Sequence, residues 1–148
     1  VFRKKIIFSL KLLIKKILNK YKIKPINVLG HSDIAPYRKK DPGKKFPWKD
    51  LYLNNLSYYP KYQINIKDNL IKKWFFKFNL KNKKQISLFI LRFIGYDTLR
   101  SINSAYYFKI LIYKYQMHYV QRNITGKIDN ITFNFLVKHY INLVLTTK

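Results

Sequence analysis

Residues 28–48 read VLGHSDIAPYRKKDPGKKFPW, and this stretch differs in composition from the sequence around it. It holds three of the five prolines and two of the four glycines of the 148-residue chain, together with one histidine and two aspartates. Proline and glycine cluster in this way where the backbone follows a fixed irregular path. We therefore predict a rigid loop from Gly30 to Trp48, entered from a short buried strand at 26–29.

The segment before this loop has helical periodicity. Apolar residues recur at steps of three and four from Ile6 to Tyr21, with lysines on the opposite face. This pattern predicts an amphipathic helix that lies on a core and ends before Pro25. A helix lying on a membrane surface is the alternative, because no stretch approaches the length needed to cross a bilayer.

The segments after the loop also read as mostly helical. A turn or two of helix is expected at 47–53, a polar, tyrosine-rich connector at about 54–69, and a short apolar and basic helical segment at 69–80. Three helices follow at 84–94, 101–120 and 129–145, with Ser101 and Asp129 as N-caps and Gly126 at the reversal before the last one. Helix, strand and loop followed by a three-helix bundle predict an α+β fold class.

The charge of the chain is extreme. Lys and Arg number 31 against six acids, which gives a formal net charge of +25. Such a balance favours a polyanionic partner, either nucleic acid or an anionic membrane. However, lysine outnumbers arginine 26 to 5, whereas nucleic-acid readers rely on arginine, and AT-rich codon usage accounts for much of the excess. We therefore rank nucleic-acid binding low.

The loop also carries the residues that suggest chemistry. The chain has no cysteine and no glutamate, so a metal would need imidazole, aspartate or carbonyl ligands. His31 and Asp41, held together by a rigid loop, would make two ligands of a catalytic zinc site, and Lys39 could stabilise an oxyanion there. By spacing alone, a structural histidine and a turn-forming aspartate explain the same residues.

The complete string is more specific than its parts. It resembles the signature of the zinc-dependent N-acetylmuramoyl-L-alanine amidases of the AmpD and AmiD type, the amidase type 2 family. That signature runs Gly-His-Ser-Asp-Ile-Ala-Pro, then Arg-Lys, any residue, Asp-Pro-Gly, then Phe and Trp, and every position is present between residues 30 and 48.

The resemblance implies a reaction and a set of roles. It implies hydrolysis of the amide between N-acetylmuramic acid and L-alanine in peptidoglycan, with Zn²⁺ as cofactor. Carried over residue by residue, it makes His31 and Asp41 zinc ligands and Lys39 the residue that stabilises the transition state. It makes Asp33 a support for the loop rather than a ligand.

The second half resembles the three-helix peptidoglycan-binding module of AmiD-like enzymes. The resemblance rests on the runs 91–96, 115–119 and 126–129, with a preserved Tyr115-Gln116 pair. It implies that residues 1–56 form the C-terminal slice of a mixed α/β amidase domain, that 57–80 is a connector, and that 81–148 is the module. Peptidoglycan or muropeptide is the implied partner.

The resemblance also implies missing parts. In the family, a further zinc histidine and a glutamate that activates water lie in a longer N-terminal portion, which we expect to be absent here. We therefore expect the chain alone to be inactive, and a non-catalytic wall-binding remnant is an alternative function. We expect His118 and His139 to be too far away to reach the loop. The implied location is the periplasm or cell envelope, although no convincing signal peptide is present, and the cytoplasm is the alternative.

Overall fold

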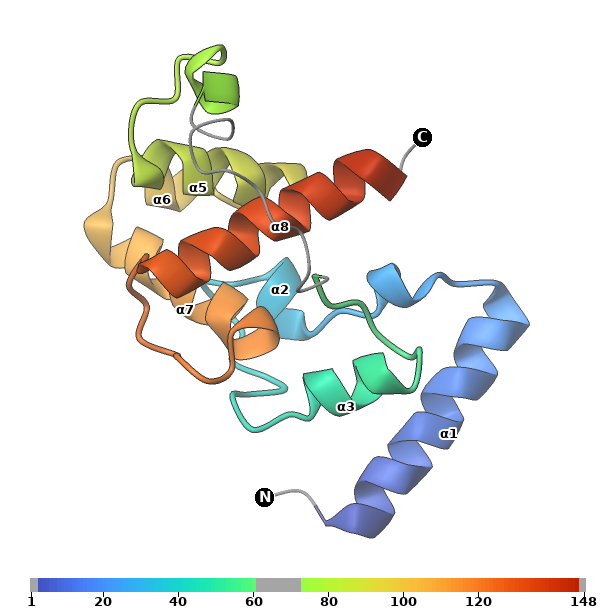
Figure 1. Ribbon diagram of the computed structural model, residues 1–148. Coiled ribbons are helices and arrows are strands. Elements are labelled where there is room, and N and C mark those ends of the chain that lie inside the picture. The colour runs from blue at the N-terminus through green and yellow to red at the C-terminus, as the bar shows by residue number, and fades with distance from the viewer. Residues whose placement is uncertain (1–2, 61–72, 147–148) are drawn as a thin grey trace.

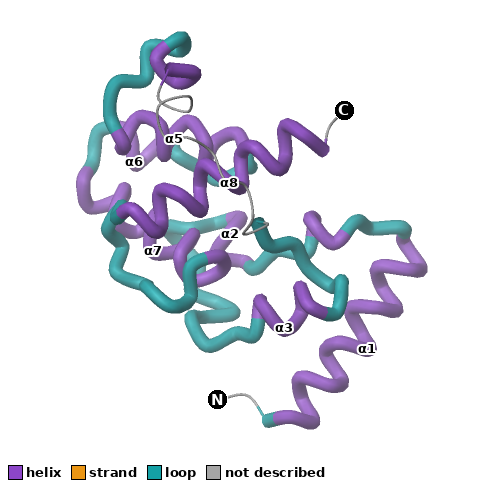
Figure 2. The backbone as a smooth tube through the Cα atoms, in the orientation of Figure 1, coloured by secondary structure: helices purple, strands orange, loops and turns teal. Residues whose placement is uncertain are grey.

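The structure is a computed structural model that describes residues 3–60 and 73–146 (Figure 1). These residues form helices joined by loops and turns (Figure 2). In chain order, the helical elements are α1 (Lys4–Tyr21), the 3-10 turn η1 (Pro25–Asn27), α2 (His31–Ile34), α3 (Trp48–Leu53), α5 (Lys83–Phe93), α6 (Leu99–Ile102), α7 (Ala105–Tyr119) and α8 (Asn130–Thr146). Residues 73–76 add one helical turn.

The α+β fold class is wrong, because the described residues contain no strand. Where a strand was expected at 26–29, the chain makes a 3-10 turn. Its last hydrogen bond is donated by the Val28 amide to the Pro25 carbonyl, at 3.1 Å. The backbone is extended at Val28 and again at Gly30. A strand also needs a neighbour to accept its ladder hydrogen bonds, and the described residues offer none. The apolar run at 26–29 therefore forms the end of a 3-10 turn and then extended backbone, without a sheet.

Helix α1 lies along one side of the molecule, next to α3 (Figure 1). It ends at Tyr21, and the next residue, Lys22, has a left-handed backbone with φ 54°. Its described contacts concentrate near the C-terminal end, where Leu18 packs with Trp48, Leu51 and Leu56 in a small apolar cluster. Ile14, one turn earlier, packs against the same cluster, whereas three apolar side chains of α1 that were expected on the core face are exposed: Ile6, Leu13 and Ile17.

Residues 83–146, from α5 to α8, are called the helical half here, and its helices follow the predicted boundaries closely. The helix expected at 84–94 is α5, and the one expected at 129–145 is α8. Asp129 caps α8 as predicted, because its Oδ1 accepts the Thr132 amide at 2.7 Å. The helix expected at 101–120 is broken into α6 and α7, and Ser104 rather than Ser101 caps the second piece by accepting the Tyr107 amide.

The main core lies between α5, α7 and α8. Its fully buried members include Ile90, Leu111, Ile112, Tyr115 and Leu136. Three tyrosines from outside these helices, Tyr37, Tyr58 and Tyr59, pack against it, so the motif loop and the segment after α3 share this core. Among the described helices, none combines the length and apolar character that a membrane span requires.

Candidate functional site

The motif loop places His31 and Asp41 side by side. His31 is the first residue of α2, a single helical turn, rather than the residue after a strand. The loop returns so that Nδ1 of His31 and Oδ2 of Asp41 are in hydrogen-bonding contact. The same return is fixed by the backbone, since the Ser32 amide donates to the Asp41 carbonyl at 3.0 Å.

This pair faces solvent. The side chain of His31 is 72% exposed and that of Asp41 is 57% exposed. The pKa of Asp41 is lowered, chiefly by the hydrogen bond from His31, with a smaller contribution from the charge of Lys39. The carboxylate is therefore ionised at neutral pH beside a ring nitrogen and a nearby ammonium group. Such an arrangement can hold a cation and leave it open to a substrate.

The donor chemistry fits part of a zinc site. Imidazole nitrogen and carboxylate oxygen are normal zinc ligands, and a catalytic zinc usually takes three of them from the protein. Within residues 3–60 and 73–146, no group of three or more His, Cys, Asp or Glu side chains is placed to hold a metal. The pair therefore fits two ligand positions.

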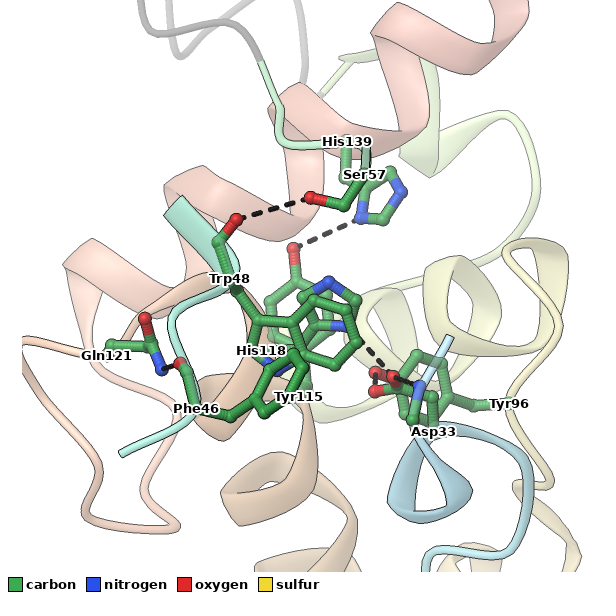
Figure 3. A network of polar contacts seen from close by, with 10 residues as sticks. Asp33, Phe46, Trp48, Ser57, Tyr96, Tyr115, His118, Gln121 and His139 are labelled. Atoms are coloured by element: carbon green, nitrogen blue, oxygen red, sulfur yellow. Dashed lines mark hydrogen bonds and ion pairs between the residues drawn. The ribbon is translucent and has the colours of Figure 1, made fainter. Parts of the chain in front are cut away.

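The inner face of the same loop carries a buried carboxylate. Asp33 is 3% exposed and accepts three hydrogen bonds (Figure 3). Its Oδ2 accepts the Gly30 amide and Nδ1 of His118, each at 2.8 Å, and its Oδ1 accepts the Tyr96 hydroxyl at 2.5 Å. Two of the three donors come from the helical half of the chain.

The protonation states of this cluster follow from its surroundings. Burial raises the pKa of Asp33, but the hydrogen bond and charge of His118, with the donors Tyr96 and Gly30, outweigh it and leave the pKa lowered. Burial and the Asp33 charge raise the pKa of Tyr96 well above its usual value. The hydroxyl therefore keeps its proton and donates. Because an ionised carboxylate only accepts, His118 must carry its proton on Nδ1.

His118 is where sequence reasoning was wrong, because this residue does reach the loop. Its ring is 2% exposed and stacks on Trp48, with centroids 3.6 Å apart and planes 16° apart. Its Nε2 is buried and has no hydrogen-bond partner in the described structure. His139 lies in the core, where its Nδ1 is 3.4 Å from the Tyr115 hydroxyl (Figure 3).

Two further contacts tie the loop to the helical half. The Tyr37 hydroxyl lies 2.9 Å from the Asp97 carbonyl, to which it donates, and 2.8 Å from the Ser101 hydroxyl. At the other end of the loop, Nε2 of Gln121 donates to the Phe46 carbonyl at 2.7 Å and to the Lys44 carbonyl at 3.1 Å. The loop is therefore held at both ends and in the middle.

Another lysine comes close to the exposed pair. Lys114 of α7 is 6% exposed, and burial lowers its pKa, with Lys40 adding to that effect and Asp41 opposing it. Lys39 itself is exposed. The local sequence around Lys114, His118 and Tyr96 does not predict a contact with the loop. The packing of α7 against α2 brings Lys114 and His118 there, and Tyr96 reaches Asp33 from the turn after α5.

Comparison with known proteins gives one sequence relative and several structural ones. The chain is 50% identical over 48 residues to the N-acetylmuramoyl-L-alanine amidase AmiD of Escherichia coli K12, which is 32% of this chain and 17% of AmiD. The crystal structure of AmpDh3 from Pseudomonas aeruginosa superposes with a TM-score of 0.76 at 32% identity, covering 95% of this chain and 54% of AmpDh3. No family model matches the sequence.

A second structural relative is a complex with a muropeptide. Escherichia coli AmiD in complex with anhydro-N-acetylmuramic acid-L-Ala-D-γ-Glu-L-Lys superposes with a TM-score of 0.74 at 28% identity, covering 92% of this chain and 51% of AmiD. The fold and the motif loop thus mark the chain as a relative of the N-acetylmuramoyl-L-alanine amidases. The chain is similar to both AmpDh3 and AmiD, and it spans about half the length of these structural relatives.

Proposed function

We propose that this chain contributes the second half of a zinc-dependent N-acetylmuramoyl-L-alanine amidase of the cell envelope. The substrate would be peptidoglycan or a muropeptide, cut at the amide between N-acetylmuramic acid and L-alanine. The observation that carries the proposal is the contact between His31 and Asp41, which brings two zinc-ligating groups to one exposed point within the complete motif. In this proposal residues 1–56 belong to the amidase domain and 81–148 form the wall-binding module.

The roles proposed for the loop residues are those that the family resemblance implies, and the geometry of the loop supports them. His31 and Asp41 would hold the metal, and the lowered pKa of Asp41 keeps its carboxylate ionised and able to act as a ligand. Zinc, when bound, would polarise the scissile carbonyl and acidify water. The exposed ammonium of Lys39, close enough to act on the Asp41 charge, would stabilise the negative oxygen that develops on the carbonyl.

Zinc binding tests the ligand assignment directly. The 148-residue chain is titrated with Zn²⁺ in competition with a fluorescent chelator at pH 7. We expect 1:1 binding that is weak for a zinc enzyme, because two ligands hold the ion less firmly than three. His31→Ala and Asp41→Ala should each abolish it, whereas Asp50→Ala, which removes an aspartate outside the loop, should leave it unchanged. Binding that survives both loop substitutions contradicts the assignment.

Activity is best tested inside a complete relative. The part of Escherichia coli AmiD that superposes on this chain is replaced by the chain, and stem-peptide release from muropeptide is measured. We expect hydrolysis by this chimaera and a loss of at least 100-fold with Lys39→Ala, within the range for removing one group that stabilises the oxyanion. His31→Ala should lower activity at least as much, because it removes a proposed zinc ligand. The isolated chain should release nothing, because it contains no glutamate to act as base. A folded chimaera without activity would contradict the proposed function.

A further inference from the structure

We propose that Tyr96 and His118, which belong to the helical half, are positioning residues for the zinc-ligand pair, acting through the buried carboxylate of Asp33. This inference rests on the proposed function and extends it. The helical half then has a role in building the amidase site, in addition to the wall binding expected from its resemblance.

The first step is the geometry of α2. His31 and Asp33 are the first and third residues of a single helical turn, so their side chains leave opposite faces of it. Asp33 is drawn inward by its three donors, whereas His31 is 72% exposed. Fixing Asp33 on the inner face therefore fixes the direction in which the His31 ring points. If Asp33 were released, the short helix would be free to turn, because it has only one turn of its own hydrogen bonds.

The second step connects α2 to Asp41. The Ser32 amide, between the two motif residues, donates to the Asp41 carbonyl at 3.0 Å. On the other side, Gly30 packs so closely that an added Cβ would lie 2.6 Å from Cδ of Pro42, the residue after Asp41. The position of α2 thus sets the positions of both members of the pair.

The third step is the origin of the donors. Tyr96 follows α5 and His118 lies near the end of α7, at 63 and 85 residues from Asp33 in sequence. The hydroxyl and the ring nitrogen approach Asp33 from the helical half, while Trp48 of the loop covers the His118 ring (Figure 3). Without these donors the carboxylate would be buried with a single amide partner. A buried ionised group in that state is costly, so the loop would rearrange to expose it.

The test uses the 148-residue chain with two pairs of matched variants. Tyr96→Phe removes the hydroxyl that faces Asp33, and Tyr115→Phe removes another buried hydroxyl, which faces His139 instead. His118→Leu removes the ring donor, and His118→Asn restores an N–H near the Nδ1 position. A purely structural role would make the two tyrosine variants alike and would give no advantage to Asn over Leu.

Two measurements read the loop rather than overall stability. One is hydrogen exchange of the Ser32 amide relative to that of Leu136, a fully buried residue in α8. The other is Zn²⁺ affinity by chelator competition. We expect Tyr96→Phe and His118→Leu to raise the exchange ratio and weaken zinc binding by about tenfold, the size typical of partners that orient metal ligands. Tyr115→Phe and His118→Asn should stay within about threefold of the unsubstituted chain.

The outcomes separate this inference from the proposed function. An unchanged exchange ratio in Tyr96→Phe and His118→Leu, or an equal change in Tyr115→Phe, would overturn the positioning role. Failure of the unsubstituted chain to bind zinc would instead contradict the proposed function. In that case the exchange ratio still decides whether Tyr96 and His118 set the geometry of the His31 and Asp41 pair.

Discussion

The outer and inner faces of the motif loop carry the same residue types in opposite environments. On the outer face, Asp41 contacts His31 in solvent, and on the inner face Asp33 contacts His118 in the core. The side-chain exposures are 57% and 72% for the outer pair and 2% for each member of the inner pair. An aspartate–histidine contact is therefore not one kind of feature, because burial decides what it can do.

The difference separates chemistry from support. The outer pair can exchange its mutual contact for a cation, because both groups are hydrated and the energetic difference is small. The inner pair cannot, since Asp33 is fully used by three donors and removal of any of them leaves a buried charge short of partners. The loop thus carries one pair, His31 and Asp41, whose contact a ligand can replace, and a second pair, Asp33 and His118, that holds the loop in place.

The largest expected effect is on the inner face. Asp33→Ala leaves the His118 and Tyr96 donors buried without their acceptor, and we expect it to lower the free energy of unfolding by about 3–5 kcal/mol. Urea unfolding followed by circular dichroism measures the change. Asp33→Asn, which keeps one carbonyl oxygen, should lose less than Asp33→Ala. Equal stability of Asp33→Ala and the unsubstituted chain would show that this cluster does not hold the loop.

The pH dependence of stability should be the next largest effect. Burial, followed by the charge of His118, lowers the pKa of His139 from 6.5 to about 3, and Asp33 opposes this shift. Between these values the unfolded chain binds a proton that the folded chain does not, so stability rises with pH and is lost as pH falls below about 6.5. We expect a loss of about 3 kcal/mol between pH 7 and pH 4.5.

Urea unfolding at several pH values measures this slope. His139→Gln has no titrating group at this position, so the slope of its stability between pH 7 and pH 4.5 should be smaller than that of the unsubstituted chain, whatever its absolute stability. Asp33 does not interfere in this window, because its pKa lies below 3.8. The same slope in His139→Gln as in the unsubstituted chain would contradict the assignment.

The sequence predicted which residues lie on the outer face of the loop, but not the contacts on its inner face. The motif places His31 and Asp41 in one loop, where the structure brings them into contact, whereas their roles and that of Lys39 are implied by the family resemblance and stay predictions. The partners of Asp33 lie 63 and 85 residues away, and periodicity reports that a helix has a buried face without reporting what that face touches.

The helices were predictable for a similar reason. The boundaries of α5 and α8 and the Asp129 cap depend on local hydrogen bonds and periodicity. The conformation of residues 26–29 was not predictable in this way, because an apolar run becomes a strand only beside another strand. The break before α7 was also missed, since Ser101 and Ser104 are equally good caps by residue type, whereas Ser101 lies within α6 and its hydroxyl contacts that of Tyr37.

A smaller effect should come from the ends of the loop. Gln121→Ala removes two hydrogen bonds to backbone carbonyls of the loop at a partly buried site, and we expect a loss of about 1 kcal/mol in thermal or urea unfolding. Gln85→Ala is the matched control, because that glutamine accepts a hydrogen bond from the exposed Lys81 amide four residues away. If the two variants lose equally, the contacts of Gln121 are no more important to the loop than a local surface contact.

The smallest effect on stability should come from the outer face. His31→Ala and Asp41→Ala remove side chains that solvent already surrounds, and neither leaves a buried group without a partner. In the absence of zinc we expect both to unfold at the same urea concentration as the unsubstituted chain, while zinc binding is lost. A structural histidine paired with a turn-forming aspartate would behave in the opposite way, with lower stability and no change in zinc binding. A drop as large as that of Asp33→Ala would therefore make the two faces alike and would remove the basis for assigning the metal ligands.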